Sequence, residues 1–149
     1  MLKAALGFGM DVVGYDPSLS VEGALRLPGR KMKMVDTLDE LAAVSDYVTL
    51  HAPYNDHTKG LVGSEFLGHM KRDACLLNFA RGELVDEAAL AAFFDSGATG
   101  RYVCDFAVGP ELSKRPNVIT IPHLGASTDE ADENAAAMAA GTTSLFLQT

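Results

Sequence analysis

Five short apolar runs recur along this chain, and their spacing constrains its fold more than any other feature. The runs are MDVVGY (10–15), DYVTLHA (46–52), ACLLNFA (74–80), RYVCDF (101–106) and NVITIPH (117–123). They are rich in β-branched residues, and their apolar positions are nearly continuous, which is typical of strands that are buried on both faces. They predict the strands of one parallel sheet.

Helix-like segments separate these runs. Their start signals are the capping boxes at 37–40 and 127–130 and the candidate N-caps Ser64 and Asp86. Gly97 would end the third segment, and we expect the Ala-rich segment 128–147 to be a long helix. Residues 18–33 have weak periodicity and predict a connection with at most a short helical turn. Alternating strands and helices imply right-handed crossovers, so the predicted fold class is doubly wound α/β, in one domain.

Composition narrows the range of partners. The chain has 149 residues, with 12 Lys and Arg against 20 Asp and Glu, and a formal charge of -8. This charge would repel nucleic acids and anionic lipid surfaces, so we expect neither a nucleic acid nor a membrane as a partner. Cys75 and Cys104 lie inside apolar runs and are predicted to be core thiols, not metal ligands or disulfide partners. We therefore expect no metal site. Asp11 interrupts the apolar N-terminal stretch and no small-residue cleavage site follows it, so we expect no export signal and a cytoplasmic location.

The stretch ALGFGMDVVGYDP (5–17) tests whether the chain carries a glycine-rich phosphate loop. A dinucleotide-binding fingerprint is G-x-G-x-x-G between a strand and a helix, with an acidic residue about 20 residues later. Here Val12 replaces the third glycine, and Asp16 follows too closely for a crossover helix. We interpret Gly7-Phe8-Gly9 as the end of a helix and expect the phosphate loop to precede residue 1. Asp16, at a strand end, suits the ribose hydroxyls of an adenosine, although a turn residue before Pro17 is the ordinary alternative.

Polar side chains follow all five predicted strands. They are Asp16, His51, Asn78 with Arg81, Asp105, and His123. Ligands of parallel sheets bind beyond the carboxyl ends of the strands, so this set is the candidate site. His123 can exchange a proton with a substrate hydroxyl if a carboxylate fixes its tautomer, and the planar guanidinium of Arg81 suits a substrate carboxylate. Taken singly, His123 would be a structural histidine, and Arg81 a surface partner of Glu83 or Asp86.

Four longer sequence motifs follow one another along the chain. They are MDVVGYDP, DYVTLHAPYNDHTKGLVG, NFARGELVDEAAL and PHLGASTDEADEN. Together they resemble the NAD-binding domain of the D-isomer-specific 2-hydroxyacid dehydrogenases over nearly the whole chain, and the last motif is similar to the phosphoglycerate branch. The resemblance implies a Rossmann-like domain, NAD as cofactor and a homodimer. It also implies an oxidoreductase acting on the CH–OH group of a D-2-hydroxy acid, expected to be D-3-phosphoglycerate in serine biosynthesis.

The resemblance also implies residue roles. Arg81 would hold the carboxylate of the substrate, and His123 would take the hydroxyl proton. The acidic partner of His123 normally stands where this chain has Pro110, so the role is assigned to Glu111 with a shift of one position. The implied cofactor-binding residues are Asp16, His51, Ala52, Pro53, Ala80, Arg81, Asp105, His123 and Gly125.

The sequence also departs from the family pattern. The first strand, the glycine loop and the separate substrate-binding domain do not occur in residues 1–149. We expect these residues to be a partial NAD-binding domain that binds NAD weakly and does not turn over substrate alone. Three alternatives remain: a relative acting on glyoxylate, hydroxypyruvate or lactate, a non-catalytic NAD-sensing module, and a methyltransferase. The last would explain Asp16 but not Arg81 and His123.

Overall fold

The structure is a computed structural model, and it describes residues 1–27 and 32–124. Gly125 and the helix expected over 128–147 lie outside these residues. In chain order, the elements are α1 (Leu2–Gly7), β1 (Val12–Gly14), α2 (Val21–Arg26), β2 (Met32–Met34), α3 (Leu38–Val44), β3 (Tyr47–Leu50), α4 (Ser64–His69), β4 (Cys75–Asn78), the 3₁₀ helix η1 (Gly82–Leu84), α5 (Glu87–Asp95), β5 (Arg101–Cys104), α6 (Pro110–Ser113) and β6 (Val118–Thr120).

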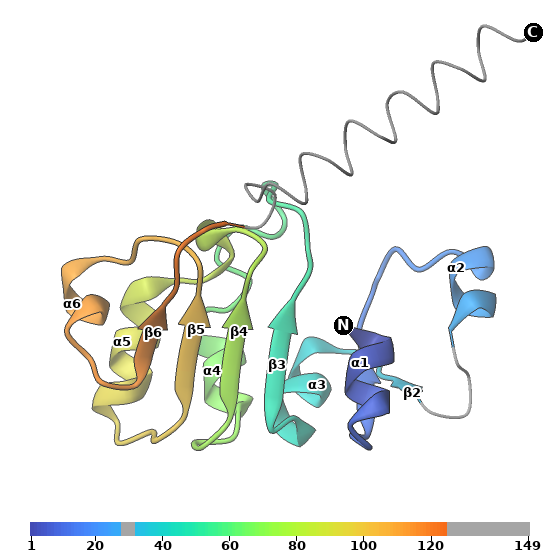
Figure 1. The fold of residues 1–149 in the computed structure, drawn as a ribbon, viewed down its shortest axis with the longest axis horizontal. Coiled ribbons are helices and arrows are strands. Elements are labelled where there is room, and N and C mark those ends of the chain that lie inside the picture. Colours follow the sequence, from blue (N-terminus) through green and yellow to red (C-terminus); the bar gives the residue numbers. More distant parts are fainter. Residues whose placement is uncertain (28–31, 125–149) are drawn as a thin grey trace, which may run out of the picture.

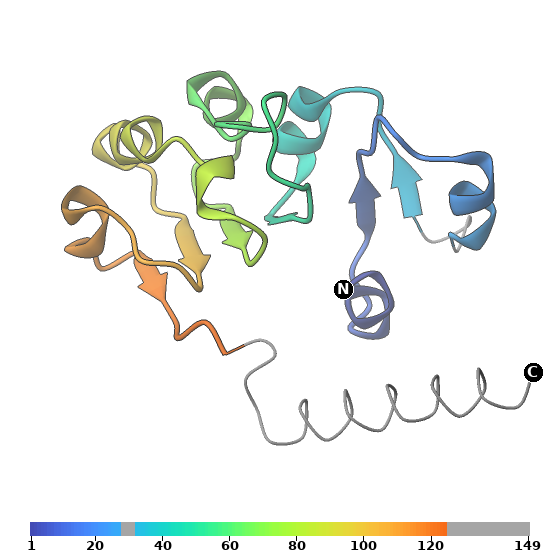
Figure 2. The ribbon, with the colours of Figure 1, turned by 90° about the horizontal axis from the view of Figure 1, so that it is seen from above.

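The strands of the described residues form two parallel sheets (Figure 1). Strand β1 pairs with β2, and the second sheet has the order β3-β4-β5-β6. Helices α3, α4 and α5 lie on one side of the four-stranded sheet, whereas α1 lies on the other side, next to β1 (Figure 2). Each of the five predicted runs contains a strand, and the doubly wound, Rossmann-like α/β class is confirmed.

The prediction for residues 18–33 contained too little secondary structure. This segment contains a helix, α2, and ends in a strand, β2, whose Met32 lies opposite Val12 of β1. Helix α2 begins after Ser20, whose hydroxyl accepts a hydrogen bond from the Gly23 N–H at 3.0 Å. Strand β2 is a three-residue segment, MKM, with a lysine at its centre. It is too short to show periodicity and depends on pairing with β1.

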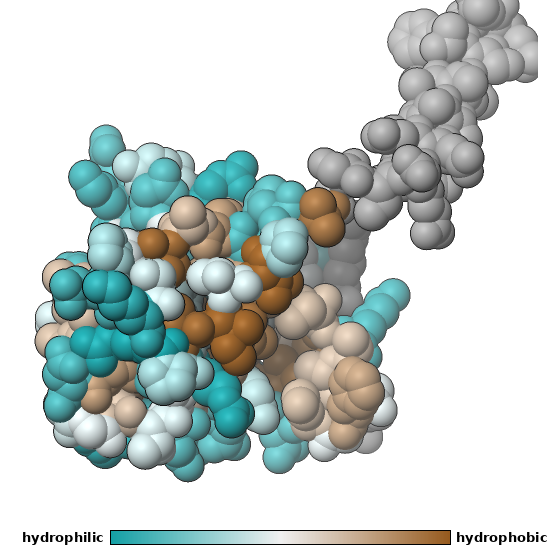
Figure 3. Space-filling view, turned by 60° about the vertical axis from the view of Figure 1, so that its left-hand side comes forward, coloured by the Kyte–Doolittle hydropathy of each residue, from teal (hydrophilic) through white to brown (hydrophobic). Residues whose placement is uncertain are grey.

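The expectation that the strands are buried on both faces was also wrong for the described residues. Along β3 and β5, buried residues alternate with more exposed ones, and Tyr47 and Ile119 on the uncovered face are 63% and 42% exposed. The cause is topological. The connections from β3 to β6 all step in the same direction, and right-handed crossovers then place their helices on the same side. Figure 3 shows the brown apolar side chains that remain at the surface.

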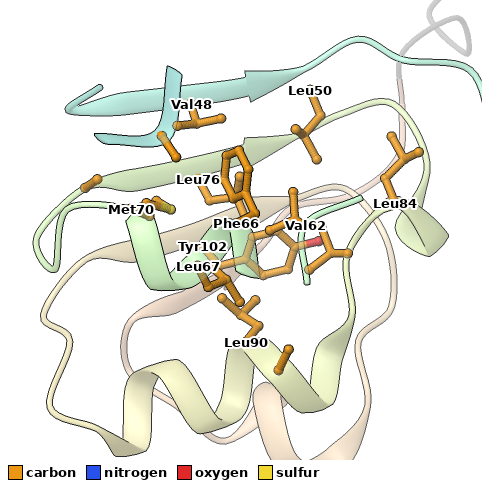
Figure 4. Packing of buried hydrophobic residues seen from close by; sticks show 14 of the residues in the cluster. Val48, Leu50, Val62, Phe66, Leu67, Met70, Leu76, Leu84, Leu90 and Tyr102 are labelled. Atoms are coloured by element: carbon orange, nitrogen blue, oxygen red, sulfur yellow. The ribbon is translucent and has the colours of Figure 1, made fainter. Parts of the chain in front are cut away.

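The core lies between the four-stranded sheet and these helices (Figure 4). Val48 and Leu76 from the strands meet Phe66 and Leu67 from α4 and Leu90 from α5, and all five are buried. This packing fixes the strands in register, and with them the positions of the residues that follow each strand.

Local start and stop signals were mostly predicted correctly. The Thr37 hydroxyl accepts from the Glu40 N–H at 3.1 Å, and the Asp86 carboxylate accepts from two N–H groups of α5 at 3.0 Å. Ser64 was wrong as a cap, because it is the first residue of α4 and Gly63 occupies the N-cap position without a side chain. Gly97, with φ of 90°, follows the end of α5.

The glycines near the N-terminus belong to a helix end, as predicted. Helix α1 ends at Gly7, Phe8 is its C-cap, and Gly9 has φ of 76°. A positive φ directly after a helix is typical of a glycine stop. Gly7-Phe8-Gly9 is therefore not a phosphate-binding loop.

Candidate functional site

The predicted site residues come together at one edge of the larger sheet. Strands β3 to β6 are parallel neighbours, so the residues that follow them leave the sheet on the same side. His51, Asp105 and His123 directly follow or closely succeed β3, β5 and β6, and Arg81 follows β4 after a short turn. Asp16 stands apart, because it follows β1 of the smaller sheet.

The closest pairing at this edge joins His123 to Asp105. The Nδ1 atom of His123 lies 2.9 Å from Oδ2 of Asp105. The histidine side chain is 59% exposed, whereas that of Asp105 is only 12% exposed. The ring of Phe106 lies beside the imidazole, with centroids 5.6 Å apart and planes inclined by 35°. His123 thus has a fixed partner on one ring nitrogen and an accessible second nitrogen.

Asp105 also carries an unused acceptor. Its Oδ1 atom is buried and has no hydrogen-bond partner among the described residues. Buried carboxylate oxygens are nearly always hydrogen-bonded, because leaving one unpaired costs about 1–3 kcal/mol. An unpaired oxygen at a strand end marks a place where a ligand N–H or a water would be bound.

Asn78 shapes the turn that carries Arg81. Its side chain is fully buried, and its Nδ2 donates to the Arg81 carbonyl at 2.8 Å, while Oδ1 accepts from the Ala80 N–H at 3.1 Å. The same Nδ2 also donates to the Tyr102 hydroxyl at 3.4 Å. Asn78, counted above among the polar strand ends, therefore holds the turn and does not face a ligand.

The guanidinium of Arg81 is exposed at this turn. Its Nη1 donates to the Ala80 carbonyl at 2.7 Å, and among the described residues it forms no ion pair with Glu83 or Asp86. The Asp86 carboxylate instead caps α5. The remaining N–H groups of Arg81 are directed to no carboxylate of the described chain, which leaves the fork available for an anionic ligand.

The segment after β3 is an ordered loop. The Thr58 hydroxyl donates to the Pro53 carbonyl at 2.6 Å, and Asn55 accepts from the N–H groups of His57 and Thr58 at 2.9 and 3.1 Å. His51 is exposed, with Nε2 3.1 Å from the Thr49 hydroxyl. Ala52 packs against the core. These bonds fix the course of the backbone past the predicted cofactor residues.

Three further predicted residues lie away from this cluster or outside the described chain. The carboxylate of Asp16 is exposed and accepts from the Ser18 N–H at 2.9 Å, as a turn residue does. Glu111 lies in the first turn of α6, and its carboxylate forms no ion pair with His123, which is paired with Asp105. Gly125 lies outside the described residues.

Two groups in the larger sheet, the buried Tyr102 and the partly buried Cys75, have shifted pKa values. Burial raises the pKa of the Tyr102 hydroxyl well above its usual range, and the hydrogen bond with Asn78 opposes this only in part. Burial also raises the pKa of the Cys75 thiol, against the opposing charge of Arg101. Both groups stay protonated at neutral pH, so neither is an activated nucleophile.

The described residues were also compared with the requirements of other kinds of site. A hollow lined by Asp46, Asp73 and Arg101, among others, lies at the amino ends of β3 to β5, opposite the candidate site. No cluster of three or more potential metal ligands occurs in residues 1–27 and 32–124. Within the same residues, no helix has the length and apolarity that crossing a bilayer requires.

Comparison with known proteins decides the family. A model of the D-isomer specific 2-hydroxyacid dehydrogenases, NAD binding domain, matches residues 1–125. The chain belongs to this family. The match is to an NAD-binding domain, and it confirms both the resemblance carried by the four motifs and the predicted cofactor.

Individual 2-hydroxyacid dehydrogenases show the same likeness. D-3-phosphoglycerate dehydrogenase of Methanocaldococcus jannaschii is 35% identical over 145 residues, which is 94% of this chain and 27% of that protein. The crystal structure of apo D-mandelate dehydrogenase from Rhodotorula graminis superposes with a TM-score of 0.74 at 32% identity, covering 87% of this chain and 38% of that one. D-lactate dehydrogenase from Aquifex aeolicus, complexed with NAD and lactic acid, gives 0.76 at 25% identity, covering 99% and 49%. The chain thus spans about a quarter of the length of the curated relative.

Sequence reasoning missed one residue of the site and one pairing. Phe106 was not singled out, although it flanks the imidazole of His123. The pairing of Asp105 with His123 was not foreseen either, although both residues follow neighbouring strands. The sequence places each of these residues after a predicted strand, but the contact could be predicted only if β5 and β6 were known to be adjacent in the sheet.

Proposed function

We propose that these residues form the NAD-binding part of a dehydrogenase that oxidises the CH–OH group of a D-2-hydroxy acid. The observation that carries the proposal is the His123–Asp105 pair at the carboxyl edge of the sheet, with the exposed guanidinium of Arg81 following the neighbouring strand β4. A base and an anion-binding fork at one edge are what removal of a proton from a hydroxy acid requires.

The residues of this edge fit NAD. Asp105 offers a buried acceptor without a partner among the described residues, which suits the N–H of a carboxamide. In the proposal, Ala80 and Arg81 border the nicotinamide end, His51, Ala52 and Pro53 border the cleft, and Asp16 accepts from the ribose hydroxyls. Bound there, NAD would supply the acceptor for the hydride released from the carbon that bears the hydroxyl.

The chain's own residues handle the charge and the proton. The Arg81 guanidinium binds the carboxylate of the substrate by paired N–H donors and so fixes its orientation. Nε2 of His123 takes the hydroxyl proton, since Nδ1 is occupied by Asp105. The imidazolium that results lies against a carboxylate, which stabilises its charge.

D-3-phosphoglycerate is the proposed substrate, at the entry to serine biosynthesis in the cytoplasm. Support comes from the motif PHLGASTDEADEN and from the 35% identity to a D-3-phosphoglycerate dehydrogenase. Relatives whose names state D-mandelate, D-lactate or glyoxylate keep other 2-hydroxy acids as alternatives. We further propose that the active protein is a homodimer.

The domain itself is proposed to be incomplete in these residues. Strands β1 and β3 belong to different sheets and do not pair with each other. A parallel strand between them, followed by a glycine-rich loop, would join the two sheets and supply N–H donors to the pyrophosphate. We therefore propose that a segment outside residues 1–149 contributes this strand, and that residues 1–149 alone bind NAD weakly.

The test uses the full-length protein that contains these residues, with D-3-phosphoglycerate, D-lactate and D-mandelate compared by the absorbance of NADH formed. Glyoxylate is tested in the reverse direction, by the loss of NADH. We expect His123→Asn to lower kcat by about 10²–10⁴-fold and to leave the Kd for NAD nearly unchanged, because the histidine acts on the proton. The matched control is His57→Asn, which changes an exposed histidine in the loop after β3. Absence of turnover with every acid, together with saturable NAD binding that His123→Asn does not alter, would favour an NAD-sensing module instead.

A further inference from the structure

We propose that Asp105 is the positioning residue that fixes the tautomer of His123, and that Glu111 does not have this role. The inference rests on the proposed function for its catalytic meaning, but the pairing itself is a property of the fold. It differs from the assignment that the family resemblance implied, which placed the acidic partner at Glu111.

The first argument is distance and burial. Oδ2 of Asp105 lies 2.9 Å from Nδ1 of His123, within the range of a charge-assisted hydrogen bond. The carboxylate is 12% exposed, so little water competes with the imidazole for it. A short bond to a largely buried carboxylate is the arrangement that holds a histidine in one tautomer.

The second argument is how the two residues are held. The Ile121 N–H donates to the Cys104 carbonyl at 2.9 Å, so the pairing of β5 with β6 continues to the residue before Asp105 and to within two residues of His123. Phe106 flanks the imidazole on the same segment. The pair is therefore set by backbone hydrogen bonds between adjacent strands and not by a chance contact of two loops.

The third argument concerns the anchoring of Glu111. Helix α6 is fixed by Leu112, which is fully buried, and by the Gly109 N–H, which donates to Oε2 of Glu87 at 2.8 Å. The Arg115 Nε donates to the Glu111 carbonyl at 3.0 Å. With the backbone of α6 held in this way, Glu111 is exposed, and its carboxylate forms no ion pair with His123 in the described part of the chain.

The consequence is a defined direction of proton transfer. Nδ1–H donates to Oδ2 of Asp105, so Nε2 carries the lone pair that can accept a proton, on a side chain that is 59% exposed. When Nε2 binds the proton of a substrate hydroxyl, the imidazolium and the carboxylate form a neutral pair, and no further proton has to move. Oδ1 of Asp105 remains free for a second partner.

The decisive measurement is the tautomer of His123, read from the ¹⁵N chemical shifts of its ring nitrogens at about pH 9, where histidine is neutral. The chain has 4 histidines, so the signals are assigned by the loss of one set in His123→Gln. We expect the Nδ1–H form to predominate in the unaltered protein and to fall below half in Asp105→Ala. Glu111→Ala is the matched control and should leave the ratio unchanged.

Two safeguards keep the test decisive. Asp105→Leu fills the same partly buried space without an acceptor, and circular dichroism shows which of the two variants is folded. An unchanged tautomer ratio in a folded Asp105 variant, or a shift in Glu111→Ala, overturns the inference. Failure of the proposed function looks different, since the full-length protein would then turn over no hydroxy acid although the tautomer still depends on Asp105.

Discussion

Replacing Asn78 by alanine should destabilise the fold more than an ordinary loss of one hydrogen bond. The side chain is fully buried and bonds the Ala80 N–H at 3.1 Å, the Arg81 carbonyl at 2.8 Å and the Tyr102 hydroxyl at 3.4 Å. Leaving a buried polar group without its partner costs about 1–3 kcal/mol. Because the turn at Arg81 is partly open to water, we expect a total loss of about 2–4 kcal/mol, at the higher end if the Tyr102 hydroxyl stays unpaired.

The assay is urea unfolding followed by circular dichroism, with Asn117→Ala as the matched control. Among the described residues, the Asn117 side chain makes one hydrogen bond, from Nδ2 to the Gly100 carbonyl at 3.2 Å, and Asn117 lies at the amino end of β6. Its loss should cost about 1 kcal/mol. Both variants should keep the m-value of the parent, so that the midpoints report stability directly. The reasoning is refuted if Asn78→Ala is no less stable than Asn117→Ala.

Three further predictions concern stability. Removing the α5 cap with Asp86→Ala should cost about 1–2 kcal/mol in the same urea assay, and a loss near zero would mean that water replaces the cap. Burial raises the pKa of the Tyr102 hydroxyl, so the unfolded chain loses this proton at a lower pH than the folded chain does. The contribution of Tyr102 to the free energy of unfolding is therefore complete below about pH 10 and declines above it by up to about 1.4 kcal/mol per pH unit. Between about pH 10 and 11, the free energy of unfolding of Tyr102→Phe should fall less steeply than that of the parent. Gly100→Ala should lower the melting temperature because its Cβ would overlap the Ala74 carbonyl, whereas Gly68→Ala, which meets nothing within 4 Å on α4, should be neutral or stabilising by up to about 1 kcal/mol. A lower melting temperature for Gly68→Ala than for Gly100→Ala would contradict the packing described.

The amino-acid sequence was sufficient to predict the features that depend on residues close together along the chain. Apolar runs predicted a strand at each of five places, and the caps at Thr37 and Asp86 were correct because a cap bonds N–H groups two or three residues away. Gly9 could be predicted as a helix stop for the same reason, since a helix end needs a residue that tolerates positive φ. The four motifs also identified the family, which the comparison confirmed.

The features that depend on which strands are neighbours became known only from the three-dimensional arrangement of the chain. Strand β2 exists through its pairing with β1, and the one-sided burial of the larger sheet follows from the direction of its crossovers. Asp105 and His123 meet because β5 and β6 are adjacent and remain hydrogen-bonded close to these residues. Glu111 is nearer to His123 along the chain, but it is exposed on α6 and forms no ion pair with His123 among the described residues. Distance along the chain says little about such contacts, since hydrogen bonding between strands and packing of side chains set distance in space.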